Sequence, residues 1–410
     1  MNIVQGAESL FENLIRWRRH FHENPELSFE EFNTANFIIH ELEKIEHLSL
    51  ETFIGGYGIV ATLSSGTGPT IAVRADMDAL PITEENKHGF VSRNEGVMHA
   101  CGHDAHMAIL LGTIHLLQRQ LMDGKLHGTV KFIFQPAEEA TDENGLSGAT
   151  HMIQAGVLDN VDAIIALHVC PWQPVGTVQM NNGFSMANVD VFEGVIRGSG
   201  GHGGYPHLGT DPMWMLGTFL QTFYGMVGRK ISPLEIVAAS IGRIEAGAAS
   251  NVIPSEVYLE GTLRSYSPET RDRLAAEVKE VFKIVEAFGG SYDLHVEKGE
   301  PALNNNMEIN MIIDQAINDI YPNMHIHWEP FGMGGEDFGY MTEKVPGAMF
   351  FLGCQMEDGV QRDLHTPIFD IDERCLPIGT AIFVATVNHF LQRESDHTEP
   401  SKGSSFLEGA

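Results

Sequence analysis

Residues 98–109, MHACGHDAHMAI, place one cysteine, one aspartate and three histidines at the start of an apolar stretch. Cys101 and His103 offer a thiolate and an imidazole two positions apart, and both groups bind Zn²⁺ and similar ions. His106 lies at helical spacing from His103, so we expect it to pack or to orient a ligand. Asp104 could equally cap the helix or bind a metal. A C-x-H pair is a weak signal alone, so other segments must supply the remaining groups.

The adjacent carboxylates Glu138 and Glu139 follow a run with Val130, Phe132 and Phe134 at period two, which predicts a strand. Such a pair is often no more than a solvated loop charge. Adjacent side chains point in different directions, however, so one could bind a metal while the other faces a water molecule. A metal lowers the pKa of its water towards ~7, and a free carboxylate can carry the proton to a leaving amine. The pair therefore suits metal-assisted hydrolysis.

Two further histidines follow apolar runs. His168 lies in DAIIALHVCPW, where we expect it at the end of a strand, and His365 follows GAMFFLG. A lone histidine in such a place is usually a core residue, but these two accompany carboxylates and a C-x-H pair. Together the groups would give two divalent ions a shared site, as in many hydrolases with metals ~3.5–4 Å apart. The predicted ligands are Cys101, His103, Glu139, His168 and His365.

Helical and strand patterns alternate around these residues. PTIAVRAD (69–76) and the runs before Glu138, at His168 and before His365 predict strands, and the apolar stripe from Met107 to Leu121 predicts a helix. Alternation of this kind predicts an α/β fold with a mixed, mostly parallel sheet. Ligands bind beyond the carboxyl ends of such strands. Five polar residues fall there: Asp76, Asp78, Glu138, Glu139 and His168.

Residues 186–298 follow a different order, β–α–β–β–α–β, which predicts a ferredoxin-like α+β domain inserted into the α/β domain. The catalytic domain would then comprise 1–185 and 299–393. We expect the polar tail 394–410 to be disordered.

Composition narrows the class of protein. The net charge of −30, from 25 basic and 55 acidic residues, disfavours nucleic acid as a partner. Four widely spaced cysteines do not form a disulfide framework, and buried thiols are expected for Cys170, Cys354 and Cys375. The N-terminus lacks the apolar core of a signal peptide, and no apolar run approaches the ~18 residues that would span a bilayer. We therefore expect a cytoplasmic protein that does not bind membranes.

Across about residues 10–390 the sequence resembles the M20 metallopeptidase family in its amidohydrolase branch, which holds aminoacylases, hippurate hydrolases, auxin-conjugate hydrolases and N-acetyldiaminopimelate deacetylases. The motifs that carry the resemblance are RRHFHENPELSFEE, MHACGHDAHMA, QPAEE, LHV, GGHGGYPH, NVIP, GTLRSY, GGEDFGYM and LHTP.

The resemblance implies roles for individual residues. Glu138 would be the general base for a water that bridges two metals, and His202 would stabilise the oxyanion, commonly in the partner subunit's site. Asn251 and Arg264 would hold the substrate carboxylate. Asp78 would orient a ligand, whereas Asp76 stands where other M20 branches carry the histidine of an H-x-D motif.

The resemblance also implies what the whole protein does. The ligand set admits Zn, Mn, Co or Ni, two ions per subunit. The substrate would be an N-acyl-L-amino acid or, as the alternative, a dipeptide cleaved by a dipeptidase or carboxypeptidase with the same mechanism. The insert would be a lid and a dimerisation domain, which implies a homodimer, with a tetramer as the alternative.

Two other classes are open. A cysteine hydrolase would use Cys101 as nucleophile, but the pattern of a base with an orienting partner is missing. A non-enzymatic metal-binding protein on a hydrolase scaffold would have no use for Glu138 as a spare carboxylate.

Overall fold

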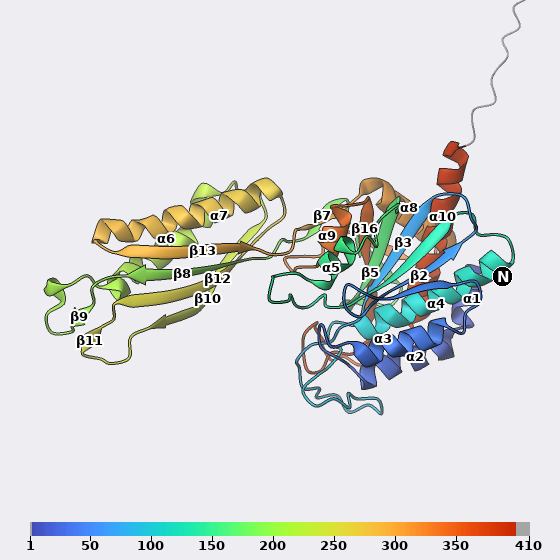
Figure 1. Cartoon of the computed structure of the whole chain (residues 1–410), viewed down its shortest axis with the longest axis horizontal. Coiled ribbons are helices and arrows are strands. Elements are labelled where there is room, and N and C mark those ends of the chain that lie inside the picture. The colour runs from blue at the N-terminus through green and yellow to red at the C-terminus, as the bar shows by residue number, and fades with distance from the viewer. Residues whose placement is uncertain (1, 399–410) are drawn as a thin grey trace, which may run out of the picture. The chain divides into compact units, whose positions relative to one another are not determined.

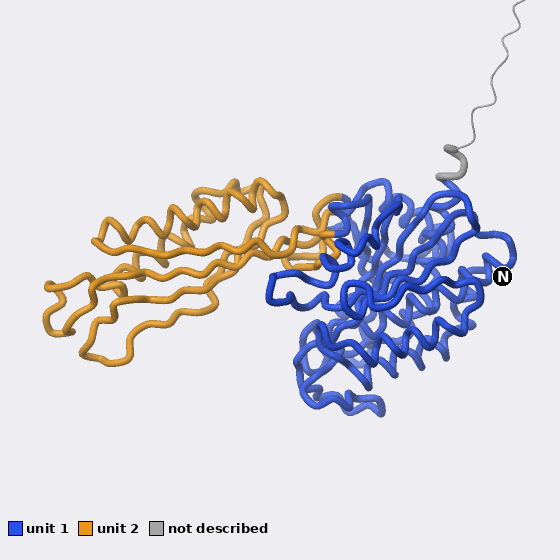
Figure 2. Tube along the Cα trace, viewed as in Figure 1, with its two compact units in different colours: residues 1–182, 305–329, 341–410 blue, residues 183–304, 330–340 orange. Residues whose placement is uncertain are grey.

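The computed structural model describes residues 2–398. The chain forms two compact units (Figure 2). Unit 1 contains the described parts of 1–182, 305–329 and 341–410, and unit 2 contains 183–304 and 330–340. Unit 2 starts and ends a few residues outside the 186–298 that we expected for the insert.

The segment 330–340, which we expected in the catalytic domain, groups with unit 2 because its backbone is tied there. The amide of Gly332 donates to the carbonyl of Ser185 at 3.1 Å, and its own carbonyl accepts from the Tyr266 hydroxyl at 3.1 Å. The carbonyl of Gly334 accepts from the amide of Ala187 at 3.0 Å.

Unit 1 is built on a mixed eight-stranded sheet (Figure 1). In spatial order its strands are β1 (Ser49–Ile54), β2 (Gly58–Ser64), β4 (Thr129–Gln135), β3 (Thr70–Asp76), β5 (Ala163–Pro174), β16 (Gly347–Gln355), β6 (Thr177–Met180) and β15 (His325–Trp328). Neighbours among β4, β3, β5 and β16 are parallel, and so are β6 and β15. The remaining pairs are antiparallel. The predicted α/β class with a mixed, mostly parallel sheet is confirmed.

Helices pack against this sheet, and α4 and α10 lie directly on it. The helices of unit 1 are α1 (Ile3–Glu8), α2 (Phe11–Glu23), α3 (Phe32–Leu42), α4 (His103–Met122), α5 (Gly148–Gln154), α8 (Met307–Ile320) and α10 (Cys375–Thr398). The short α9 (Phe338–Thr342) spans the boundary between the units. Helix α10 runs past residue 394, where we expected an irregular tail to begin. The rest of that tail, 399–410, lies outside the described residues.

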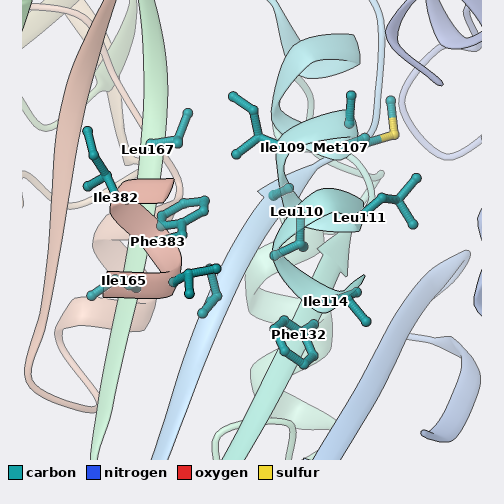
Figure 3. Close-up of a cluster of buried hydrophobic side chains, with 14 of the residues drawn as sticks. Met107, Ile109, Leu110, Leu111, Ile114, Phe132, Ile165, Leu167, Ile382 and Phe383 are labelled. Carbon is teal, nitrogen blue, oxygen red and sulfur yellow. The ribbon is translucent and has the colours of Figure 1, made fainter. Parts of the chain in front are cut away.

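The core of unit 1 surrounds α4. Figure 3 shows Ile109, Leu110, Leu111 and Ile114 pointing from α4 in several directions, towards the strands and α10. We expected a single apolar stripe, but this helix is buried on nearly all sides because α2, α10 and the sheet enclose it. The segment carrying the cysteine and histidines at its start is therefore held rigidly.

One described helix, α10 from Cys375 to Arg393, is long and apolar enough by composition to cross a membrane. The helix meets this test through its mean hydropathy and not as an unbroken apolar run, since Thr380, Thr386 and Asn388 interrupt it. Within the structure, 72% of its most apolar window is buried, as expected for a core helix, because it packs on α4 and α8.

Unit 2 is a four-stranded antiparallel sheet with two helices. Its elements are β8 (Asp190–Arg197), β9 (Gly201–His202), η1 (Pro206–Leu208), α6 (Pro212–Lys230), β10 (Val237–Ala246), β11 (Val252–Ile253), β12 (Glu256–Ser265), α7 (Pro268–Phe282), η2 (Lys283–Phe288) and β13 (Ser291–Lys298). The spatial order β10–β12–β8–β13 is that of a ferredoxin-like fold, as predicted. Strands β7 (Gly183–Met186) and β14 (Leu303–Asn305) form a separate two-stranded sheet.

The two helices of unit 2 begin with the same local signal. Asp211 and Ser267 cap α6 and α7 through their side-chain oxygens, and a proline follows each at the first helical position. Their apolar faces meet the sheet around Phe192, Phe219 and Phe282.

Candidate metal centre and active site

His168 lies inside β5, whereas we had expected it at the end of the strand. β3 pairs with β5 only as far as Arg74 and Ala166, whereas β5 continues to Pro174 along β16. His168 therefore lies two residues beyond the last residue of β5 that pairs with β3. The sequence pattern missed this because buried parallel strands carry no polar residue to mark where their neighbours stop.

Gly102 brings the Cys101–His103 segment against this strand. Its φ of 92° is left-handed, and a Cβ there would lie 2.2 Å from Cγ2 of Val169, the residue after His168. Only glycine accepts both the backbone angle and the close approach. We infer that Gly102 allows the thiol of Cys101 and the imidazole of His103 to lie close to the imidazole of His168.

The structure brings all five predicted ligands together. The Sγ of Cys101 lies 3.3 Å from Nε2 of His168 and 3.3 Å from Nε2 of His365. The Oε1 of Glu139 lies 3.4 Å from Nε2 of His365 and 3.8 Å from Nε2 of His103. Cys101 thus belongs to two groups of three possible ligands, one with His103 and His168 and the other with Glu139 and His365.

The two contacts of the Cys101 thiol are within hydrogen-bonding distance for sulfur, and the same spacings also suit ligands that share an ion. Tetrahedral ligands with bonds of ~2.0–2.3 Å to zinc stand about 3.3–3.6 Å apart. His103 Nε2 and Glu139 Oε1 are buried and have no hydrogen-bond partner in the described part of the chain. Because an unsatisfied buried polar atom is costly, a cation between these atoms would remove the penalty. The residues present therefore fit a pair of divalent ions that share the thiolate.

The electrostatics of the site favour a cation. Burial, and then the carboxylates of Glu139 and Glu138, raise the pKa of the Cys101 thiol well above its usual value. Burial alone would lower the pKa of His103, but Asp76 and Asp78 outweigh it and raise this pKa to about 10. A thiol held neutral in this way is a poor nucleophile, which counts against the cysteine-hydrolase alternative.

Asp78 connects two of the candidate ligands. The Nδ1–H of His103 donates to the backbone carbonyl of Asp78 at 2.8 Å. The Asp78 carboxylate accepts from the backbone amide of Glu139 at 2.9 Å and from the Ser28 hydroxyl at 2.7 Å. These contacts fit the orienting role expected for Asp78.

His106 has both ring nitrogens engaged. Nδ1 lies 2.6 Å from Oδ1 of Asp76, and Nε2 accepts from the backbone amide of Val169 at 3.0 Å. Asp76 in turn accepts from Arg74 at 2.6 Å. These contacts fit the expected packing and orienting role of His106. They also show that Asp76 binds His106 and Arg74.

Asp104 is not the N-cap of α4, so that reading from the sequence was wrong, although its Oδ1 accepts from the amide of Ala105 in the first turn at 2.9 Å. Gly102 occupies the N-cap position. The Asp104 carboxylate accepts from Nε of Arg18 at 2.9 Å and from Nδ1 of His22 at 2.8 Å. The sequence offered one signal for this contact, the RRHFHENPEL motif, but could not say where it would pack.

Two candidate site positions have unusual backbone angles. Ala137, directly before Glu138, has a φ of 46°, and His365 has a φ of 59°. Left-handed angles in non-glycine residues store strain and gather at functional sites. Glu138 is buried, and its carboxylate groups with His103 and Glu139.

The other predicted site residues belong to unit 2. His202 is exposed on β9, where it pairs in register with Val252 and accepts from the amide of Gly204 at 2.9 Å. The carbonyl of Asn251 accepts from the amide of Gly203 at 2.8 Å, so the loops carrying His202 and Asn251 are joined. Arg264 is partly buried on β12, and its Nε donates to the Thr262 hydroxyl at 3.1 Å.

Residues 72–389 match the family model described as peptidase family M20/M25/M40. The chain belongs to this family. It is 38% identical over 376 residues to the N-acetylcysteine deacetylase of Bacillus subtilis (strain 168), covering 90% of this chain and 94% of that protein. It is 35% identical over 388 residues to thermostable carboxypeptidase 2 of Saccharolobus solfataricus, covering 92% and 96%. These relatives confirm the resemblance to the amidohydrolase branch of M20, and with it an enzyme that hydrolyses amides.

Among solved structures, the chain is similar to the Bacillus subtilis YxeP protein, described as a dinuclear metal binding peptidase of the M20 family. The TM-score is 0.81 at 33% identity, covering 94% of this chain and 99% of the other. Membership of the M20 family supports divalent metal cofactors for the cluster around Cys101.

Proposed function

We propose that the protein hydrolyses the amide bond of N-acyl-L-amino acids with two divalent metal ions, Zn, Mn, Co or Ni. The observation that carries the proposal is the double cluster around Cys101, with the buried Glu138 beside it. The similarity to an N-acetylcysteine deacetylase supports the acyl-amino acid class of substrate.

Bound ions would supply an acidified water and a Lewis acid for the amide carbonyl. Cys101, His103, Glu139, His168 and His365 would hold them. Glu138 would take the proton that the attacking water loses and deliver it to the departing nitrogen. Its burial beside His103 and Glu139 would limit the access of bulk water to that proton.

Residues of unit 2 would bind and polarise the substrate. Arg264 would pair with the substrate carboxylate, with Asn251 as a second contact, and His202 would donate a hydrogen bond to the developing oxyanion. The exposure of His202 in its own unit fits a donor that is completed by another copy of the chain. A homodimer is therefore part of the proposal.

We expect Arg264→Met to raise KM for N-acyl amino acids about 10–100-fold with little change in kcat, because a charge-assisted contact worth ~1.5–3 kcal/mol is lost from ground state and transition state alike. Steady-state kinetics on free-acid substrates and on their carboxamides would measure it. The wild type and the variant should differ only on the free acids. Arg243→Met, on exposed β10, is the matched control and should leave both values unchanged.

The test of the function is a panel of N-acetyl, N-benzoyl and indole-acetyl amino acids and dipeptides, assayed with each of the four metals. We expect turnover of acyl amino acids that requires added metal and that a chelator removes reversibly. Preference for dipeptides would favour the peptidase alternative, which the similarity to a carboxypeptidase supports. Turnover insensitive to chelator but lost on thiol alkylation would contradict the proposal and favour a cysteine hydrolase. No turnover with any metal would leave only a metal-binding protein.

A further inference from the structure

Unit 1 contains a second group of metal-ligating side chains, separate from the five candidate ligands. His22 lies on α2, and Glu84 and His88 lie on the irregular segment between β3 and α4. The possible ligand atoms of these three all lie within 4.8 Å of one another. Asp370, before α10, places Oδ2 3.7 Å from Nε2 of His88. The proposed function uses none of these residues.

The spacing of these atoms resembles that around a metal ion. Oε1 of Glu84 lies 3.1 Å from Nε2 of His22, which is a hydrogen-bonding distance, and 3.3 Å from Nε2 of His88. Ligands at the corners of a zinc tetrahedron, with bonds of ~2.0–2.1 Å, stand about 3.3–3.4 Å apart. Hydrogen-bonded pairs stand ~2.7–3.2 Å apart. Both distances from His88, to Glu84 and to Asp370, exceed the hydrogen-bond range.

A ring contact holds His88, and the polar atoms near its Nε2 are carboxylate oxygens of Glu84 at 3.3 Å and Asp370 at 3.7 Å. Both of its ring nitrogens are buried, and neither has a hydrogen-bond partner in the described part of the chain. Its ring stacks on Phe90, with centroids 3.7 Å apart and an interplanar angle of 15°. An imidazole fixed in this way with an unsatisfied nitrogen costs free energy, and a cation bound at Nε2 would remove that cost.

His22 is already oriented as a metal ligand. Its Nδ1 lies 2.8 Å from the Asp104 carboxylate, which can only accept, so Nδ1 carries the proton. Metal-binding histidines commonly donate their second nitrogen to a carboxylate in this way. Nε2 then faces the Glu84 carboxylate, which is also an acceptor. Either a second proton on His22 or a cation must lie between them.

Carboxylates outnumber guanidinium groups around these residues, which favours a bound cation. Glu84, Asp104, Asp370 and Glu373 supply four carboxylates, and the guanidinium groups of Arg18 and Arg19 supply two positive charges. Glu84 also accepts from the Asn86 side chain at 3.0 Å and from the Ser92 amide at 2.6 Å. All of these groups are largely or fully buried except Arg19. Uncompensated buried carboxylates are unfavourable.

We propose that His22, Glu84, His88 and Asp370 form a tetrahedral zinc site that serves structure and not catalysis. The ion would join α2 to the segment before Cys101, through Glu84 and His88, and to the segment after His365, through Asp370. It would thereby help to fix the positions of two candidate ligands, Cys101 and His365.

The test is the number of zinc ions per chain, measured by elemental analysis after dialysis of the full-length protein against buffered Zn²⁺. We expect His88→Gln to bind one zinc ion per chain fewer than the wild type. We also expect added zinc to raise the midpoint of thermal unfolding of the wild type more than that of the variant. His40→Gln, an exposed histidine on α3, should match the wild type. His168→Ala should keep the proposed site while losing metal from the candidate centre, which separates failure of this proposal from failure of the proposed function.

Anomalous diffraction at the zinc edge tests the same site without a variant. A peak between Glu84 and His88 is the expected result. Equal zinc content in the wild type and His88→Gln, or a map of zinc-soaked wild-type crystals with no peak there, would overturn the proposal. It would mean that a doubly protonated His22 balances Glu84.

Discussion

Replacing Glu138 by glutamine should lower kcat for N-acyl amino acids about 10²–10⁴-fold, the range that a positioned general acid–base supplies. The amide keeps the size of the side chain but cannot take or deliver the proton. Because Glu138 is not among the five candidate ligands, metal content should stay at the wild-type value. Steady-state kinetics together with elemental analysis would measure both quantities.

Glu143→Gln is the matched control, since this exposed glutamate follows Glu138 along the same loop. It should change neither kcat nor metal content. Turnover by Glu138→Gln equal to that of the wild type would refute the assignment of the base. A loss of activity that comes with a loss of bound metal would instead make Glu138 a ligand.

Replacing Arg18 by methionine should destabilise unit 1 by about 3–5 kcal/mol, the cost of leaving a buried charge without its partner. The Arg18 side chain is fully buried between Asp104 at 2.9 Å and Asp370 at 2.9 Å. Methionine fills similar space but takes the guanidinium away from both buried carboxylates. Denaturant unfolding in chelator-treated buffer would measure the change apart from any zinc effect.

Arg19→Met provides the control next to it in the sequence. Arg19 also pairs with a carboxylate, Glu373, at 2.7 Å, but 45% of its side chain is exposed. An exposed pair of this kind contributes about 0–1 kcal/mol. Equal destabilisation by the two substitutions would show that burial of Arg18 is not what makes its contacts important.

The sequence by itself determined the class of fold and limited the types of side chain that are candidate ligands. Period-two and helical patterns suffice for β3, β4, α4 and the β–α–β–β–α–β order of unit 2, because burial on one or both faces selects apolar residues at those periods. Thiolate, imidazole and carboxylate groups in short motifs likewise limit the chemistry before any fold is known. Five candidate ligands were therefore named from residue type, from the C-x-H spacing of Cys101 and His103, and from the apolar runs near Glu139, His168 and His365.

Only the tertiary structure decided which of the nearby polar residues face the candidate metal centre and which bind other side chains. His106, Asp104 and His103 share one short segment, yet one pairs with Asp76, one with Arg18, and one turns its free nitrogen to Glu139. The surroundings of His168 within β5 likewise depend on where the pairing with β3 stops. Such outcomes depend on contacts between segments far apart in the chain, and the local periodicity of the sequence does not predict those contacts.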